Sequence, residues 1–534
     1  MRATRGFRRA AILALTPLLA LAALPAATAT AAGDIPAKGC HREWPVVAHR
    51  AGGGAVSLPP GAVLPIACAT QTGFPTSETT IAITASGVPV FSPTQTENSV
   101  GRSLDAGSTW QTSTPAVEQY TALFNTVDPR LIVDRTTDTL FWVHATGPTR
   151  SAPGILPGGI VPPGELLPLA PANGFQVYRS SDSAQTWATA DYQNEPMGDW
   201  EKIFLGPPRP ASTGAPQPTG YPNVIYVCAN SPTQVTGPGR RCYRSLDGGA
   251  TFISTGFLSG LDVMGTCPPL GMDTGVVDSR GIVFEPMSCQ NADFIAVSDD
   301  ETSTYAHFLA TPAPANSSLT SGNIQLGIDG SDNLYLVWVA TDKIIVSISH
   351  DHGGSWGKPM VVSAPGVNTI TFPVITTSPG GKLGVAYYAK GSSTATGFNA
   401  YLTESFDVLD AQPLFYSATL NDPAHPIFFG SPLGVYPRAD YVGAAYDASG
   451  GLWAGVSKQF APADSNGNAQ TTGYVGRLVA LAGTLTSLPT TSNLPNTFGP
   501  HDRAAAILAL AGVVVVMVLA MWAAGRFLHR SSYR

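Results

Sequence analysis

The eight residues Ser245-Leu246-Asp247-Gly248-Gly249-Ala250-Thr251-Phe252 recur along the chain in close copies. Residues 103–110 and 349–356 are good copies, and residues 180–187 and 298–305 are looser ones. The shared pattern is Ser-x-Asp-x-Gly-x-Thr-Trp, with near misses at single positions. Its recurring aspartates are Asp105, Asp182, Asp247, Asp300 and Asp351. Repetition at intervals of roughly 50 to 80 residues indicates a repeat architecture rather than a single site.

Each copy follows the same arrangement of short strand-forming runs. In the clearest unit, residues 324–328 and 334–338 alternate or are wholly apolar and flank a turn at 329–333, and residues 344–348 then lead into the copy. Such runs, joined by Gly, Asp, Asn and Ser turns, predict about four strands per unit and little helix.

A single four-stranded sheet cannot bury both of its faces, whereas sheets packed radially around an axis can. We therefore expect an all-β fold, a β-propeller of four-stranded blades. Seven units can be counted, which favours seven blades. Six blades remain possible if the first or last unit only adds strands to a neighbouring blade. A solenoid of stacked hairpins is the alternative fold.

The composition is typical of an extracellular β-rich protein. Charged residues make up only 12% of the chain, while Gly (56) and Pro (46) are abundant, as many turns require. The net charge of −7, with no basic run outside the two ends, argues against nucleic acid as a partner.

All six cysteines lie in the region expected to be exported, where disulfides persist. Six cysteines allow 15 pairings, of which the local pairs Cys40–Cys68, Cys228–Cys242 and Cys267–Cys289 are the simplest. A metal site would favour short paired spacings such as Cys-x-x-Cys, and the sequence has none, so we predict no metal and no cofactor.

Both ends carry targeting signals. A basic start, an apolar run and small residues predict a signal peptide over 1–31. The uncharged residues 504–524, followed by a basic tail at 525–534, predict a type I single-pass anchor with its tail in the cytoplasm. Between the ends we expect an N-terminal lead-in (32–75), the propeller (76–481) and a stalk rich in Thr, Ser and Pro (482–503).

Residues 494–499, Leu-Pro-Asn-Thr-Phe-Gly, resemble the Leu-Pro-x-Thr-Gly cell-wall sorting signal of Gram-positive bacteria. The order of motif, apolar stretch and basic tail is the same, but Phe498 stands where the family has Gly. The resemblance implies attachment to the cell wall, and simple anchoring in the plasma membrane stays open beside it.

The recurring octapeptide is similar to the Asp-box, or BNR repeat, of sialidase-like propellers. The resemblance covers roughly residues 76 to 480. It implies that each Asp-box lies on the turn between the two outer strands of a blade, with its Asp and Ser bonding the turn and its aromatic residue packed between blades. In the family the boxes lie away from the catalytic face, so the five aspartates are expected to be structural.

Sialidases use a Tyr nucleophile activated by Glu, and three arginines clamp the substrate carboxylate. The first of these arginines lies in an Arg-Ile-Pro motif, which this chain lacks. Arg130 and Arg438 do not match that motif, so the resemblance implies a sialidase-like fold and does not imply sialidase activity.

Propellers bind ligands at the mouth of the axial channel, where the innermost strands begin. The polar residues ahead of each first strand are therefore candidates, and Asp199 and Glu201 are the expected acid and base if the chain is catalytic. The expected ligand-binding residues are Glu78, Asp128, Arg130, Trp200, Asp273, Arg438, Asp440 and Tyr441.

The favoured interpretation is a surface propeller that binds an extracellular glycan, peptide or protein, and the alternative is a glycoside hydrolase of exo-sialidase or related type. Two Pro- and Gly-rich insertions, 147–174 and 206–222, interrupt neighbouring units and could together shape one rim of such a site.

Overall fold

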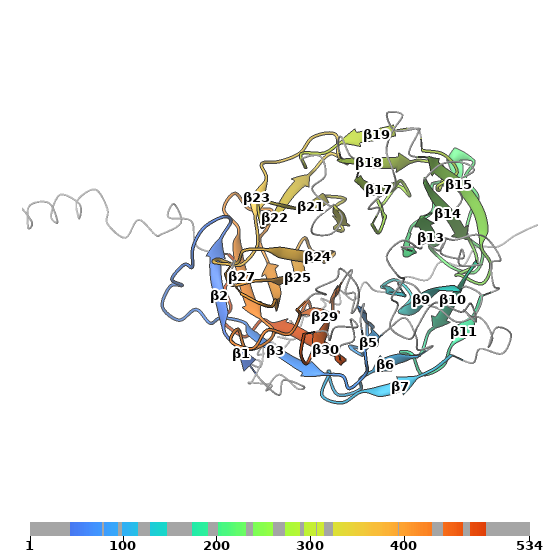
Figure 1. Cartoon of the computed structure of the whole chain (residues 1–534). Coiled ribbons are helices and arrows are strands. Elements are labelled where there is room, and N and C mark those ends of the chain that lie inside the picture. Colours follow the sequence, from blue (N-terminus) through green and yellow to red (C-terminus); the bar gives the residue numbers. More distant parts are fainter. Residues whose placement is uncertain are drawn as a thin grey trace, which may run out of the picture. The chain divides into compact units, whose positions relative to one another are not determined.

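The computed structural model describes residues 43–76, 79–93, 99–115, 129–146, 174–190, 201–230, 239–259, 273–288, 293–305, 307–313, 324–392, 395–429, 442–462 and 470–487. The chain divides into the units Met1–Pro36 and Ala37–Arg534, and every described residue belongs to the second. Within the described residues the strands form seven sheets, drawn as a ring in Figure 1. One short 3₁₀ helix, η1 (Ala211–Thr213), follows β12.

The first three blades each contain four antiparallel strands that follow one another along the chain. Blade 1 contains β4 (Thr80–Ile83), β5 (Pro89–Ser92), β6 (Val100–Arg102) and β7 (Gln111–Ser113). Blade 2 contains β8 (Arg130–Asp134), β9 (Thr139–Thr146), β10 (Gly174–Ser180) and β11 (Ala188–Thr189). Blade 3 contains β12 (Lys202–Gly206), β13 (Val224–Asn230), β14 (Gly239–Ser245) and β15 (Ile253–Ser259).

Blades 4 and 5 repeat this plan, whereas the last two sheets have five strands each. Blade 4 contains β16 (Val276–Val277), β17 (Val283–Ser288), β18 (Asp293–Ser298) and β19 (His307–Ala310). Blade 5 contains β20 (Gln325–Ile328), β21 (Leu334–Ala340), β22 (Lys343–Ser349) and β23 (Met360–Val361). Blade 6 contains β24 (Ile370–Thr377), β25 (Leu383–Ala389), β26 (Asn399–Ser405), β27 (Leu414–Thr419) and β2 (Val46–Arg50). Blade 7 contains β28 (Gly443–Tyr446), β29 (Leu452–Gln459), β30 (Thr471–Val479), β3 (Ile66–Gln71) and β1 (Glu43–Trp44).

The innermost strands form a closed ring. Each contacts the innermost strand of the next blade, from β4 through β8, β12, β16, β20, β24 and β28, and β28 returns to β4. This closure confirms the all-β propeller with seven blades. The solenoid is wrong, because the two ends of a solenoid do not meet.

The N-terminal residues close the ring. Residues 32–75 were expected to precede the propeller, but β3 pairs antiparallel with β30 as the fourth strand of blade 7. Ala67 and Ala69 on β3 are buried, so this strand is part of the core. β2 extends blade 6 by pairing with β27. Strands from both ends of the propeller region therefore share one sheet, an arrangement that joins residues about 400 positions apart.

The repeated octapeptide forms the same turn in five blades, always between the third and fourth strands. In the turn at Ser245, the Ser245 hydroxyl donates to Asp247 and accepts a hydrogen bond from Gly249 N, both at 2.8 Å. The N–H of Thr251 and its hydroxyl donate to the two oxygens of Asp247, at 2.9 and 2.6 Å. The turns of Asp105, Asp182, Asp300 and Asp351 repeat these bonds. Each carboxylate is thus engaged by its own turn.

The backbone of the turn explains its glycine. Gly249 has φ +80°, a left-handed conformation that glycine adopts without a Cβ penalty. Ala184 and Thr302 occupy the same position in the looser copies and keep positive φ values of 60° and 64°. The aromatic residue that ends the turn packs on the preceding blade, since Trp187 Nε1 of blade 2 donates to Ser113 of blade 1 at 2.8 Å.

We predict that Asp247→Ala lowers the free energy of unfolding by about 1–2 kcal/mol, because it removes the acceptor of several hydrogen bonds in one turn. Urea unfolding monitored by tryptophan fluorescence measures the change. Leu104→Ala is a suitable control, since Leu104 is an exposed side chain in an equivalent turn and makes no such bonds. Equal stability of the two variants would contradict a structural role for the carboxylate.

The antiparallel order gives the propeller two distinct faces. The repeated turns and the turns between first and second strands lie on one, which we call the turn face. The innermost strands begin at the other, which we call the mouth face. Residues 206–222 follow the first strand of blade 3 and lie on the turn face. Residues 147–173 lie outside the described residues, so a rim shared by the two insertions stays a prediction.

The expected signal peptide, sorting-like motif and membrane helix lie outside the described residues, as does the expected stalk from residue 488 on. Among the residues that are described, no helix has both the length and the apolar character needed to cross a membrane.

Candidate functional site

Polar side chains gather where the innermost strands begin at the mouth face. Arg130 and Lys202 are the first residues of β8 and β12, Gln325 is the first residue of β20, and Asp273 comes shortly before β16. All four are buried. Because these strands belong to four consecutive blades, the residues connect blades 2 to 5.

Asp273 is the centre of this group. Its carboxylate lies 3.6 Å from the Arg130 guanidinium, and Gln325 Nε2 donates to it at 2.9 Å. Thr274 donates to the same carboxylate through its backbone N–H at 2.6 Å. Gln325 also accepts a hydrogen bond from Ile375 N of blade 6 at 2.9 Å, so one side chain links three blades.

Charge governs the protonation of this carboxylate. Burial by itself raises the pKa of Asp273, but the positive charges of Arg130 and Lys202 outweigh burial and hold that pKa below its ordinary value. Asp273 is therefore an ionised acceptor near neutral pH. It is suited to holding cationic side chains or donor groups in place, and not to donating a proton.

The structure brings together only some of the predicted site residues. Arg130 and Asp273 form one ion pair, as described above, and Glu201 directly precedes β12 and is completely buried. Complete burial in this conformation keeps the Glu201 carboxylate away from solvent, which a catalytic acid or base must reach. The remaining predicted residues lie outside the described residues: Glu78, Asp128, Asp199, Trp200, Arg438, Asp440 and Tyr441.

We predict that Gln325→Ala lowers the free energy of unfolding by about 1–3 kcal/mol, because it leaves buried partners on blades 4 and 6 without their hydrogen bonds. Chemical unfolding of the full chain measures the loss. Gln217→Ala is the matched control, since Gln217 is exposed and bonds only nearby backbone oxygens. A Gln325→Ala variant as stable as this control would contradict the role of Gln325 as a link between blades.

A second polar cluster, missed by the sequence analysis, lies between blades 3 and 4. Arg240 Nε on β14 lies 2.5 Å from Glu285 Oε2 on β17, and both side chains are fully buried. The Tyr305 hydroxyl donates to Glu285, and Arg240 donates to the backbone oxygen of Asp273 at 3.1 Å. A Tyr–Glu pair is the catalytic pair of sialidases, but this Tyr ends a repeated turn and lies packed between blades. Nothing in the local sequence around these residues predicts that they meet.

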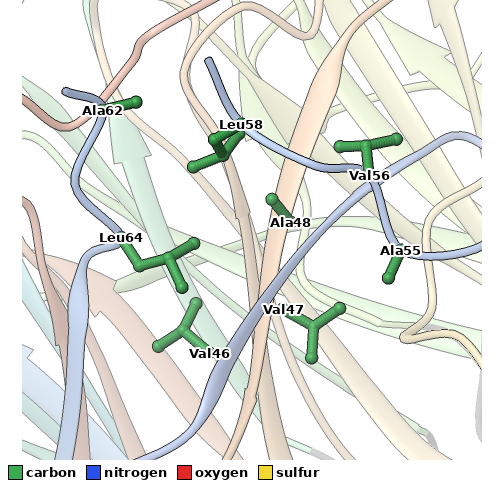
Figure 2. Close-up of a pocket in the computed structure, with 8 residues that line it drawn as sticks. All are labelled: Val46, Val47, Ala48, Ala55, Val56, Leu58, Ala62 and Leu64. Atoms are coloured by element: carbon green, nitrogen blue, oxygen red, sulfur yellow. The ribbon is translucent and has the colours of Figure 1, made fainter. Parts of the chain in front are cut away.

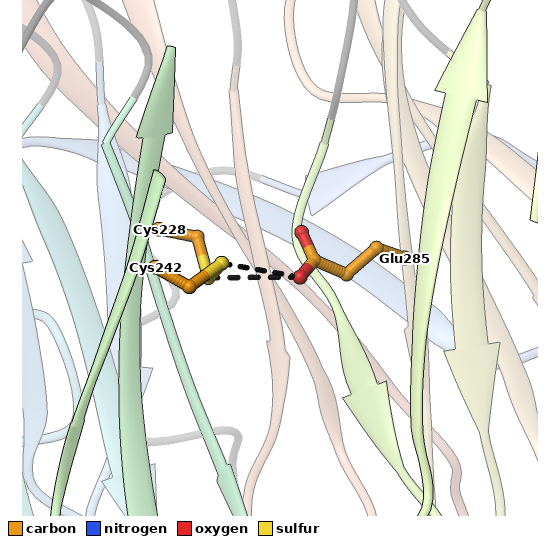
Figure 3. Close-up of side chains that lie close together, drawn as sticks. All are labelled: Cys228, Cys242 and Glu285. Carbon is orange, nitrogen blue, oxygen red and sulfur yellow. Dashed lines mark hydrogen bonds between the residues drawn. A yellow bond between two sulfur atoms is a disulfide. The ribbon is translucent and has the colours of Figure 1, made fainter. Parts of the chain in front are cut away.

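The expected disulfide Cys228–Cys242 is formed within blade 3, and Figure 3 shows it beside Glu285. The two sulfurs lie 3.6 and 3.4 Å from Glu285 Oε1. Because both sulfurs are in the disulfide, they cannot act as thiolate metal ligands, so this three-residue group is no metal site. Cys68 is also in a disulfide, and Cys40, Cys267 and Cys289 lie outside the described residues.

One other group of potential metal ligands joins blades 4 and 5 at the turn face and consists of Asp278, Asp332 and His352. Asp278 Oδ2 already contacts the Arg280 guanidinium at 2.7 Å and His352 Nδ1 at 3.3 Å. The carboxylate of Asp332 accepts hydrogen bonds from the N–H and hydroxyl of Ser279. The acceptors are thus taken up by protein donors.

The described residues line two cavities of interest. The first, about 350 Å³, lies between β2 and the chain that follows it, and the eight residues in Figure 2 give it a wholly apolar lining. It offers no side-chain group that could orient a polar ligand. The second, about 290 Å³, lies at the mouth face between blades 6 and 7 and combines aromatic with polar side chains.

Comparisons with known proteins find only distant likenesses. No family model matches the chain, and no curated protein matches it significantly. Among solved structures, a variant of the sialidase NanB from Streptococcus pneumoniae is 12% identical, with a TM-score of 0.37, over 81% of this chain and 73% of that one. An α-L-arabinanase from Penicillium chrysogenum in complex with arabinobiose is 13% identical, with a TM-score of 0.40, over 68% of this chain and 95% of its own. A streptogramin B lyase is 10% identical, with a TM-score of 0.42, over 79% and 100% of the two chains.

Proposed function

We propose that the chain is an exported, surface-anchored propeller of the sialidase-like Asp-box type that binds an extracellular glycan, peptide or protein at the axial mouth. The observation that carries this proposal is the Arg130–Asp273–Gln325 group, in which three described side chains at the mouth face are bound to one another. A group of this kind makes a rigid polar floor for a ligand, because its members are fixed before the ligand arrives.

Export and anchoring rest on the sequence. The basic and apolar start fits a signal peptide, and residues 504–524 with their basic tail fit a stop-transfer helix. The same features support a location of the propeller outside the cell, anchored in the membrane or, as the alternative, attached to the cell wall. Fractionation of expressing cells, with protease added to intact cells, tests this topology: the propeller is expected to be cut and the tail protected.

The alternative function is a glycoside hydrolase of exo-sialidase or related type. A sialidase needs several arginines that converge on the substrate carboxylate. Among the innermost strand starts that the structure describes, Arg130 is the arginine present, and it is paired with Asp273. This pairing favours binding over hydrolysis.

A glycan array probed with the full chain tests the binding function. We expect retention on at least one class of extracellular glycan, and Arg130→Ala is expected to weaken that retention. Absence of binding to glycans would leave a peptide or protein as the ligand at the same face, and crosslinking on the cell surface would then identify it.

A further inference from the structure

The cavity of about 290 Å³ between blades 6 and 7 has the composition of a small-ligand site. It is formed by the end of β1, the turn that follows β27, the end of β29 and the first part of β30. The lining residues that matter here are Trp44, Asp422, Lys458, Gln459, Phe460 and Tyr474. None of them belongs to the polar group at the innermost strands, so this cavity is a separate place on the mouth face.

A buried amide in the cavity has an unused donor. Gln459 is only 1% exposed, and its Oε1 accepts a hydrogen bond from Phe429 N at 2.6 Å. This bond fixes the orientation of the amide, and Gln459 Nε2 has no hydrogen-bond partner among the described residues. A buried N–H group without a partner destabilises the fold. An acceptor atom on a ligand would remove that destabilisation.

The walls of the cavity are aromatic and its rim is polar. Phe460 is 54% exposed, an unusual position for a phenylalanine, and Tyr474 lies on the neighbouring strand. The Lys458 ammonium lies 5.4 Å from the ring centre of Phe460 and 5.5 Å from that of Tyr474. Asp422, which lies 3.1 Å from His425, also lines the cavity, so the lining contains a hydrogen-bond acceptor as well as donors.

We propose that this cavity binds one ring of a neutral saccharide. A sugar ring has an apolar C–H face that can stack on Phe460, and its hydroxyls both accept and donate hydrogen bonds. One hydroxyl oxygen would accept from Gln459 Nε2, and another hydroxyl would donate to the Asp422 carboxylate. The volume lies at the lower limit for ligand pockets, about 300 Å³, which suits a single ring and not a chain. The lining contains the Asp422 carboxylate and the Lys458 ammonium, whose charges offset each other, and this suits a neutral ligand.

Titration of the full chain with methyl α-D-glucopyranoside, methyl β-D-galactopyranoside and N-acetylglucosamine, followed by saturation-transfer NMR, tests the proposal. We expect at least one of these sugars to bind. Phe460→Ala is expected to weaken that sugar about five- to tenfold through loss of stacking. Gln459→Met is expected to weaken it by a similar factor through loss of the amide donor. Leu104→Ala removes an exposed apolar side chain at the turn face and should leave binding unchanged.

Two results would overturn the proposal. One is failure of all three sugars to bind. The other is binding with equal affinity to the wild type and to Phe460→Ala, which would place the sugar elsewhere, including the axial mouth. That second result would contradict the saccharide site between blades 6 and 7 without contradicting ligand binding at the axial mouth. The experiment therefore distinguishes the two hypotheses. Phe460 is exposed, so its substitution should not unfold the chain, and it decides the outcome if Gln459→Met proves unstable.

Discussion

Arg240→Ala is expected to lower the free energy of unfolding by about 3–5 kcal/mol, the cost of leaving one partner of a buried ion pair alone. The Glu285 carboxylate would keep the hydrogen bond from Tyr305 but lose the guanidinium 2.5 Å away. Both side chains are fully buried between blades 3 and 4, so bulk solvent does not compensate the lost charge. Equilibrium unfolding in urea, monitored by circular dichroism, measures the effect.

A pair with a half-exposed arginine provides the control. Arg280 contacts the buried Asp278 at 2.7 Å, but the Arg280 side chain is 48% exposed, and Asp278 also accepts hydrogen bonds from the backbone N–H groups of residue 280 and Ile282. Arg280→Ala is therefore expected to cost less than Arg240→Ala. The double substitution Arg240→Met with Glu285→Leu should recover most of the stability lost by Arg240→Ala, since it removes both buried charges. Equal losses of unfolding free energy for Arg240→Ala and Arg280→Ala would show that the packing of blade 3 on blade 4 does not depend on the Arg240–Glu285 pair.

Glu404→Gln is expected to stabilise the protein in mildly alkaline solution and to have little effect in acid. Burial on β26 raises the pKa of Glu404 to about 8, although the Lys382 ammonium acts in the opposite direction. The folded chain therefore keeps this carboxyl protonated at pH values at which the unfolded chain has ionised it. Glutamine reproduces the shape of the protonated carboxyl and carries no charge to bury.

The direction of the pH dependence follows from the raised pKa. Below about pH 4.5 the carboxyl is protonated in both states, and its contribution to stability is complete. Between pH 4.5 and about 8 only the unfolded state releases the proton, so stability falls by up to about 1.4 kcal/mol for each pH unit. Across the window the loss amounts to roughly a few kcal/mol.

Unfolding free energies at pH 5 and pH 8.5 test this prediction. The wild type is expected to lose more stability between the two values than Glu404→Gln does. Glu43→Gln, which removes an exposed carboxylate on β1, serves as the matched control for the loss of a charge. Parallel pH dependence of the wild type and Glu404→Gln would contradict a buried, neutral Glu404.

Much of the fold could be predicted from the sequence because its signal is local and repeated. Each turn such as Ser245–Phe252 uses only its own residues to bind its carboxylate, so the pattern is visible in eight positions. The strand runs before each turn alternate with the period of a sheet. The turns and the strand runs together predict seven blades and the order of the strands in the first five blades.

The closure of the ring and most of the site could not be predicted in the same way. β3 pairs with β30, which lies about 400 residues away, and nothing in the sequence of β3 indicates this partner. Glu201 was predicted as a candidate acid or base from its position before a strand, and its sequence position gives no sign that tertiary packing buries it completely. Gln459 and Trp44 share a cavity only because blade 7 contains strands from both ends of the propeller.

Hydrolysis of fluorogenic glycosides by the full chain tests the proposed function most directly. If the chain binds a ligand without hydrolysing it, a panel of fluorogenic sialosides, galactosides and arabinosides should release no fluorophore. The glycan array should still detect binding. Release of fluorophore that Asp199→Ala or Glu201→Gln abolishes would contradict that function and establish the hydrolase instead.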